Sequence, residues 1–147
     1  MKFGARPLVF TLALGTAAGC ATGPQPVTRL VGDKIIVTRA VSPDAYEHFA
    51  RARLYEQEER WADVPVELQR ALAFDPDAPE VRAELAELFV KLDRLDDAAE
   101  QIDLSLASGP SVDGYMARAH LADARHDAPA ALEALRSAVT TALADDD

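Results

Sequence analysis

The sequence predicts an all-α fold, a short solenoid of three antiparallel helix pairs, and two observations lead to it. First, residues 52–76 recur almost position for position at residues 86–110, a displacement of 34. Second, apolar residues recur at helical spacing between candidate caps and turns. Such a period indicates one supersecondary unit that buries its apolar face by stacking on a copy of itself. The matched positions include Ala52 and Ala86, Leu54 and Leu88, Tyr55 and Phe89, Arg60 and Arg94, Leu68 and Ile102, and Pro76 and Pro110.

The first helix pair is expected directly after Val41. Ser42 as N-cap and Pro43 at the first helical position begin a helix that runs to about Glu58. Asp63 then caps a second helix over residues 64–74.

Two capping-box patterns introduce the second pair. Residues 77–80 (Asp-Ala-Pro-Glu) open a helix that runs to about Leu92. Residues 97–100 (Asp-Ala-Ala-Glu) precede a helix that ends near Ala107.

The third pair is expected at about residues 112–125 and 128–143. Gly114 inside its first helix costs about 1 kcal/mol relative to alanine. Its last helix carries an apolar strip, which favours dimerisation or partner contact if it stays uncovered. Alternatively, the strip packs on the preceding helices, with residues 144–147 as a solvated acidic tail. The strip consists of Leu132, Leu135, Val139, Ala142 and Leu143.

The spacing of small, aromatic and proline residues resembles the tetratricopeptide repeat (TPR) family over about residues 44–142. In that family, small residues let paired helices approach, an aromatic residue fills the gap between them, and proline ends the unit. The third repeat is degenerate, because Ala122 stands at the aromatic position. The repeats are expected at about 45–78, 79–111 and 112–143. The resemblance rests on Ala52, Tyr55, Ala71 and Pro76; on Ala86, Phe89, Ala98, Ser105 and Pro110; and on Ala119, Ala131 and Ala138.

The resemblance also implies a binding surface, because in this family the first helix of each pair lines a concave groove that holds a protein or peptide. Tyr46, Phe49 and Arg53 are the expected anchors, since aromatic and arginine side chains dominate binding energies. Alternatively, Tyr46 and Phe49 cover the segment that precedes the helices. The groove positions carried over are Tyr46, Phe49, Arg53, Glu56, Gln57, Glu80, Ala83, Glu87, Val90, Lys91, Met116, His120 and Asp123.

Residues 27–41 precede the repeats as a short β-hairpin or extended arm. Two β-branched runs, 27–31 and 34–38, flank Gly32-Asp33, which fits a hairpin with a two-residue turn. An isolated hairpin is marginal in water. We therefore expect one of three arrangements: an arm packed on the first helix pair, an edge that adds a strand to a partner, or a disordered arm.

Residues 1–19 have the order of a secretory signal, with Lys2 and Arg6 followed by an apolar run and small residues. The run is shorter than the roughly 20 residues that span a bilayer. Cys20, the only cysteine, follows Ala-Ala-Gly, which resembles the lipobox of bacterial lipoproteins, where the cysteine is acylated and becomes the first residue. Residues 20–26 would then form a tether. The alternatives are a nearby cleavage that discards Cys20, or an uncleaved anchor.

Charge and histidine placement narrow the function classes. The net charge of −10 repels nucleic acid, so we expect no nucleic-acid partner. His48, His120 and His126 lie on separate surfaces by spacing, and phosphate-loop and nucleophile motifs are absent. We therefore expect no metal, no cofactor and no catalysis.

Together these features predict a protein-binding scaffold of the bacterial cell envelope, lipid-anchored through Cys20 at the outer membrane and facing the periplasm. Its role would be to assist the assembly or stability of an envelope complex. Two alternatives remain: an exported binding module without a membrane role, and a structural homo-oligomer formed through the C-terminal helix.

Overall fold

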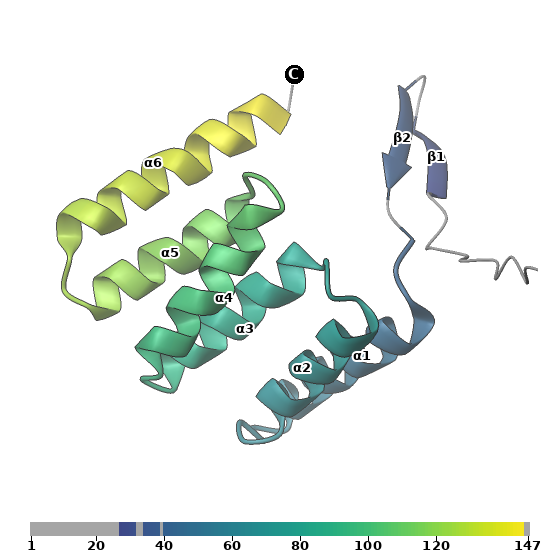
Figure 1. The fold of residues 1–147 in the computed structure, drawn as a ribbon, viewed down its shortest axis with the longest axis horizontal. Coiled ribbons are helices and arrows are strands. Elements are labelled where there is room, and N and C mark those ends of the chain that lie inside the picture. The colour runs from purple at the N-terminus through teal and green to yellow at the C-terminus, as the bar shows by residue number, and fades with distance from the viewer. Residues whose placement is uncertain (1–26, 32–33, 39, 146–147) are drawn as a thin grey trace, which may run out of the picture.

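The computed structural model of the protein describes residues 27–31, 34–38 and 40–145. These residues form a hairpin followed by six helices, arranged as the antiparallel pairs α1–α2, α3–α4 and α5–α6 (Figure 1). The predicted all-α solenoid of three helix pairs is therefore confirmed. The helices are α1 (Pro43–Gln57), α2 (Val64–Phe74), α3 (Pro79–Lys91), α4 (Leu95–Ala107), α5 (Val112–Ala124) and α6 (Ala128–Asp145).

The hairpin joins β1 (Val27–Val31) to β2 (Lys34–Thr38) as an antiparallel pair, with Val31 opposite Lys34. This register leaves a two-residue connection, as expected, although residues 32–33 themselves lie outside the described residues. In Figure 1 the described strands stand apart from the helices, and neither packs extensively against one. The expected packing of this arm on the first helix pair is therefore wrong for the described strands. The signal segment, Cys20, the tether and residues 146–147 also lie outside the described residues.

The core is centred on α3, which packs against α2, α4 and α5. Leu85, Leu88 and Phe89 of α3 are no more than 2 % exposed, and they join Leu68 of α2 and Ile102 of α4 in one cluster. A helix with neighbours on several sides needs apolar residues around most of its circumference. The sequence of α3 meets this need.

Small residues sit where paired helices approach most closely. Ala52, Ala86 and Ala119 of the first helices are buried, as the family resemblance implies. In the second helices, Ser105 of α4 stands at the repeat position that Ala71 occupies in α2. The Ser105 hydroxyl donates a hydrogen bond of 2.8 Å to the Pro79 carbonyl. A buried hydroxyl is therefore satisfied across the pair.

Gly114 also marks a close approach. A Cβ atom added there would lie 2.7 Å from Leu106 Cδ2 and 2.8 Å from the Ser111 hydroxyl, which accepts a hydrogen bond from the Gly114 amide. The expectation that this glycine only weakens its helix is thus incomplete. The absent side chain gives α4 room against the start of α5.

All three pairs turn through the same backbone motif. Glu59, Asp93 and His126, spaced 34 and 33 residues apart, have φ of 58°, 58° and 59°. The next amide in each case donates back to the helix, to the carbonyls of residues 55, 89 and 122 at 2.8, 2.8 and 2.9 Å. These are Schellman-type helix ends. The third pair therefore repeats the backbone of the first two despite its degenerate sequence.

The first two turns share a side-chain arrangement that the third lacks. The guanidinium of Arg60 lies 3.9 Å from the centre of the Tyr55 ring, and that of Arg94 lies 4.3 Å from the Phe89 ring. Such contacts are cation–π interactions. The third turn has Ala122 and Asp127 at these places, and the Asp127 carboxylate instead accepts from the Ala130 amide at 3.0 Å.

The predicted capping boxes are wrong. The N-caps are Ala78 for α3 and Arg94 for α4, and neither makes a side-chain cap hydrogen bond. Pro79 holds the residue before it out of the helical region, so α3 begins at the proline. Asp97 lies inside the first turn of α4, where its carboxylate accepts a 2.7 Å hydrogen bond from Arg94 Nε.

The apolar strip on α6 is exposed. Four large side chains of the strip, Leu132, Leu135, Val139 and Leu143, have 41–65 % of their surface open to solvent. The alternative in which this strip packs on the preceding helices is therefore wrong.

We predict that Glu59→Gly and Asp93→Gly each stabilise the fold by about 0.5–1 kcal/mol. A left-handed backbone conformation strains any residue that has a Cβ, whereas glycine adopts it without strain. The greater conformational entropy of glycine in the unfolded state offsets part of this stabilisation. Thermal unfolding would show a rise in Tm for both variants. The control Gln69→Gly, at an exposed position inside α2, should lower Tm by a similar free energy. A fall in Tm for both turn variants would contradict the prediction.

Candidate protein-binding groove

A groove of about 220 Å³ lies where the first helices of the three pairs meet. Residues from α1, α3 and α5 line it, and none of the lining residues comes from a second helix. Six of the predicted groove residues are brought together here: Arg53, Glu56, Glu80, Ala83, Glu87 and Lys91. Ala83 forms part of the buried floor, while the other five are charged. Glu84, Leu88 and Asp113 complete the lining.

An ion-paired arginine crosses this groove. Arg53 Nη1 of α1 lies 2.8 Å from Glu56 Oε2 on its own helix and 2.8 Å from Glu84 Oε1 on α3. Burial raises the pKa of Glu84 above its ordinary value; Arg53 opposes this effect, and the like charges of Glu56 and Glu87 add to it. Five carboxylates face two cations across the groove, so it carries a surplus of negative charge.

Tyr46 and Phe49, two of the predicted anchors, line a separate apolar hollow of about 200 Å³. The hollow lies between α1, the end of α2 and the start of α3, and it shares Glu80 with the charged groove. Tyr46 is 66 % exposed, whereas Phe49 is half-buried and packs against the core cluster. The predicted anchors thus divide between two adjoining subsites, with Arg53 in the charged one.

The other predicted positions line neither hollow. They are Gln57, Val90, Met116, His120 and Asp123. Val90 packs against the core, and His120 Nδ1 of α5 lies 3.3 Å from Glu87 Oε1 of α3. His120 therefore reaches a residue of the groove without lining it.

Glu84, the groove residue that forms an ion pair with Arg53, was not among the predicted positions. A signal was present, because Glu80, Glu84, Glu87 and Lys91 recur at spacings of four, three and four residues, which places them on one face of a helix. The family resemblance implied three of these four positions as groove residues, but not Glu84.

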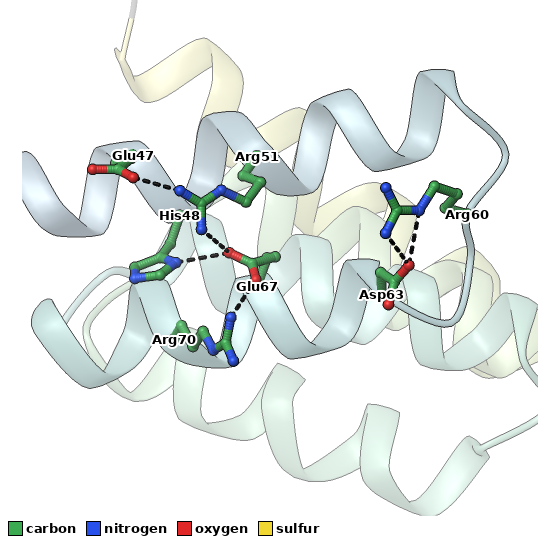
Figure 2. A network of polar contacts seen from close by, with 7 residues as sticks. All are labelled: Glu47, His48, Arg51, Arg60, Asp63, Glu67 and Arg70. Atoms are coloured by element: carbon green, nitrogen blue, oxygen red, sulfur yellow. Dashed lines mark hydrogen bonds and ion pairs between the residues drawn. The ribbon is translucent and has the colours of Figure 1, made fainter.

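A second polar cluster, at the outer side of the first pair, has a structural role (Figure 2). Glu67 of α2 is only 3 % exposed, and its carboxylate lies 2.7 Å from His48 Nδ1, 2.6 Å from Arg70 Nη1 and 3.6 Å from Arg51 Nη1. The His48 ring stacks on Phe74 at 5.5 Å. None of these residues lines the groove or the adjoining apolar hollow. The buried acid is thus satisfied within its own helix pair.

This cluster replaces an apolar stacking surface. Glu47 and Arg51 of α1, which form an ion pair, stand 34 residues before Val81 and Leu85 of α3, which face the core. The outer side of α1 is therefore polar where the equivalent side of α3 is apolar. The first pair ends the stack on this side.

Two further findings concern residues 27–31, 34–38 and 40–145. No three histidine, cysteine or acidic side chains in these ranges gather in a way that suits a metal ion. None of their helices combines the length and the apolar character that a bilayer crossing requires.

Comparison with known proteins gives one result at the level of a family. A family model described as a tetratricopeptide repeat matches residues 57–121, from the end of α1 into α5. No curated protein matches the chain.

We predict that Glu67→Gln destabilises the fold by about 1.5–3 kcal/mol at pH 7, the range for hydrogen bonds to charged groups. Burial alone would raise the pKa of Glu67, but the hydrogen bond to His48 and the charges of Arg70 and Arg51 outweigh it, so the folded-state pKa is lowered. A lowered pKa stabilises the fold above the unfolded-state value of about 4.5 and ceases to do so as pH falls through the folded-state value.

Urea unfolding of the wild type and Glu67→Gln at pH 7, 5 and 3 would measure this effect. The difference in free energy of unfolding should narrow below about pH 4.5. Glu100→Gln, at an exposed site on α4, serves as the charge-matched control and should change little at any pH. A difference that stays constant from pH 7 to pH 3 would refute the assigned role.

Proposed function

We infer that this chain, whose residues 57–121 belong to the tetratricopeptide repeat family, is a scaffold that holds a protein or peptide on the surface of its helix pairs. The observation that carries this proposal is the charged groove lined only by first helices, together with the adjoining apolar hollow at which Tyr46 is open to a partner. The proposed role is non-catalytic. Both hollows are open and neither has the acid, base and nucleophile arrangement that chemistry would need.

We further propose that Cys20 is acylated and anchors the scaffold in the bacterial envelope, at the outer membrane and facing the periplasm. The support is the sequence alone: a positive start, a short apolar run and small residues precede the one cysteine. Residues 20–26 then serve as a tether. A membrane-held groove would serve the assembly or stability of a larger envelope complex, by analogy with other repeat scaffolds.

Cys20→Ala tests the anchor. In cells fed a fatty-acid analogue, the wild type should incorporate the label and the variant should lose it, because the thiol is the attachment point. The variant should also move from the membrane fraction to the soluble fraction. Thr22→Ala, next to the same site, should keep the label. An unlabelled wild type would leave an exported module without a lipid anchor as the better description.

Site-specific cross-linking tests the groove. A photoreactive residue placed at Gln57, beside the groove, should capture a partner in cells of the source organism. Tyr46→Ala and Glu87→Lys should reduce the capture at least fivefold, since the first removes an expected anchor and the second reverses a charge that lines the groove. Leu104→Ala, an exposed apolar residue on α4, is the control and should leave capture unchanged. Capture that survives both groove variants would place the partner elsewhere.

The exposed strip on α6 favours a second candidate, a homo-oligomer. Leu132, Leu135 and Val139 recur at heptad spacing, which suits the pairing of two copies through α6. Light scattering should then show a mass that rises with concentration, and Leu135→Glu should restore the monomer mass. Leu104→Glu is the matched control. A monomer mass at all concentrations would exclude this candidate.

A further inference from the structure

The apolar hollow beside Tyr46 and Phe49 suits one large side chain of a ligand. Its volume of about 200 Å³ exceeds the roughly 150 Å³ that accommodates a benzene ring in a protein interior. Val41 and Tyr46 on its rim are 57 % and 66 % exposed, so apolar surface stays in water at this place. A neighbouring hollow extends this surface to Phe74, which is half exposed.

The charge of the neighbouring groove determines which kind of peptide can place a side chain in the apolar hollow. The charged groove begins at Glu80, the residue that also borders the apolar hollow. Arg53 is already held by Glu56 and Glu84, which leaves Lys91 as the remaining cation that lines the groove, against the carboxylates of Glu80, Glu87 and Asp113. His120 approaches Glu87 from outside the groove. A cationic side chain would neutralise this surplus, and its attraction would strengthen as the ligand displaces water. An acidic ligand would be repelled.

The distance between the subsites sets the spacing within the ligand. Tyr46 and Arg53 are seven residues apart on α1, and Glu80 and Glu87 are seven apart on α3, which corresponds to about 10 Å along each helix. An extended peptide covers this length with about three residues.

We propose that the groove side of α1 and α3 binds an extended peptide segment with one large apolar side chain beside Tyr46 and Phe49, and lysine or arginine two to four residues away, opposite Glu87 and Asp113. The proposal rests on the scaffold function and defines the chemistry of its partner. Apolar contact fixes the position of the segment, and the acidic groove selects against anionic chains.

Fluorescence anisotropy with the full-length protein in detergent tests this assignment. The probe is a labelled decapeptide, Gly-Ser-Phe-Ser-Ala-Lys-Arg-Lys-Ser-Gly. Two matched peptides replace phenylalanine by serine, or the three basic residues by glutamate. The probe should bind at least tenfold more tightly than either matched peptide, and its affinity should fall as salt rises from 50 to 500 mM.

Variants of the protein test where the basic and the apolar side chains of the peptide bind. Glu87→Gln combined with Asp113→Asn should weaken the probe about tenfold and flatten the salt dependence. Tyr46→Ala should weaken it without changing the salt dependence, and its exposed position leaves the fold intact. Glu100→Gln and Leu104→Ala, on α4, should change affinity less than twofold. Equal binding of the acidic peptide, or affinity unchanged by the groove variants, would overturn the proposal.

Cross-linking from Gln57 separates this inference from the scaffold function. Groove-dependent capture of a partner without any binding of the basic probe would overturn the peptide chemistry and leave the scaffold standing. A cross-link that joins two copies of this chain would identify the occupant as a second copy and also overturn it. Failure of both assays would remove the scaffold proposal as well.

Discussion

The close approach of paired helices at small residues is the constraint on which the rest of the structure depends. Ala52, Ala86 and Ala119 are buried at equivalent places, and each lets a second helix pack near the axis of a first helix. Because this contact recurs at a period of 33–34 residues, the first helices all come to the same side of the stack. The groove follows from that geometry. The charge of the groove comes from positions that differ between repeats, such as Arg53 and Glu87.

The repeat period made the fold predictable, whereas the capping patterns misplaced the starts of α3 and α4. Matched positions such as Tyr55 and Phe89 indicated that the same packing contact recurs in each repeat. In the structure, Phe89 lies in the core cluster and Tyr55 packs against it. A capping pattern involves only a few neighbouring residues, and other local interactions can override it. Pro79 dictated where α3 begins, and the carboxylate of Asp97 went to Arg94 because that guanidinium lies over the Phe89 ring and within reach.

The site was predictable in part, for a related reason. The family resemblance assigned groove positions to the first helix of each pair, and six of these residues line one hollow in the structure. The apolar hollow was not foreseen, because Val41, Asp75 and Ala78 come from connecting segments whose meeting depends on how α2 leads into α3. The hairpin shows the same limit. Its register follows from alternation and a short turn, but no pattern within residues 27–38 specifies a surface on which it rests.

The two ends of the stack differ in kind. At α1, the ion pair of Glu47 with Arg51 and the buried carboxylate of Glu67 occupy the side on which an earlier repeat would sit, so an added unit there would desolvate charges without compensating them. At α6, leucine and valine side chains already face outward. Duplication of a repeat during evolution, or its insertion by an engineer, would therefore be accommodated after α6 and rejected before α1, and growth of this array has a direction.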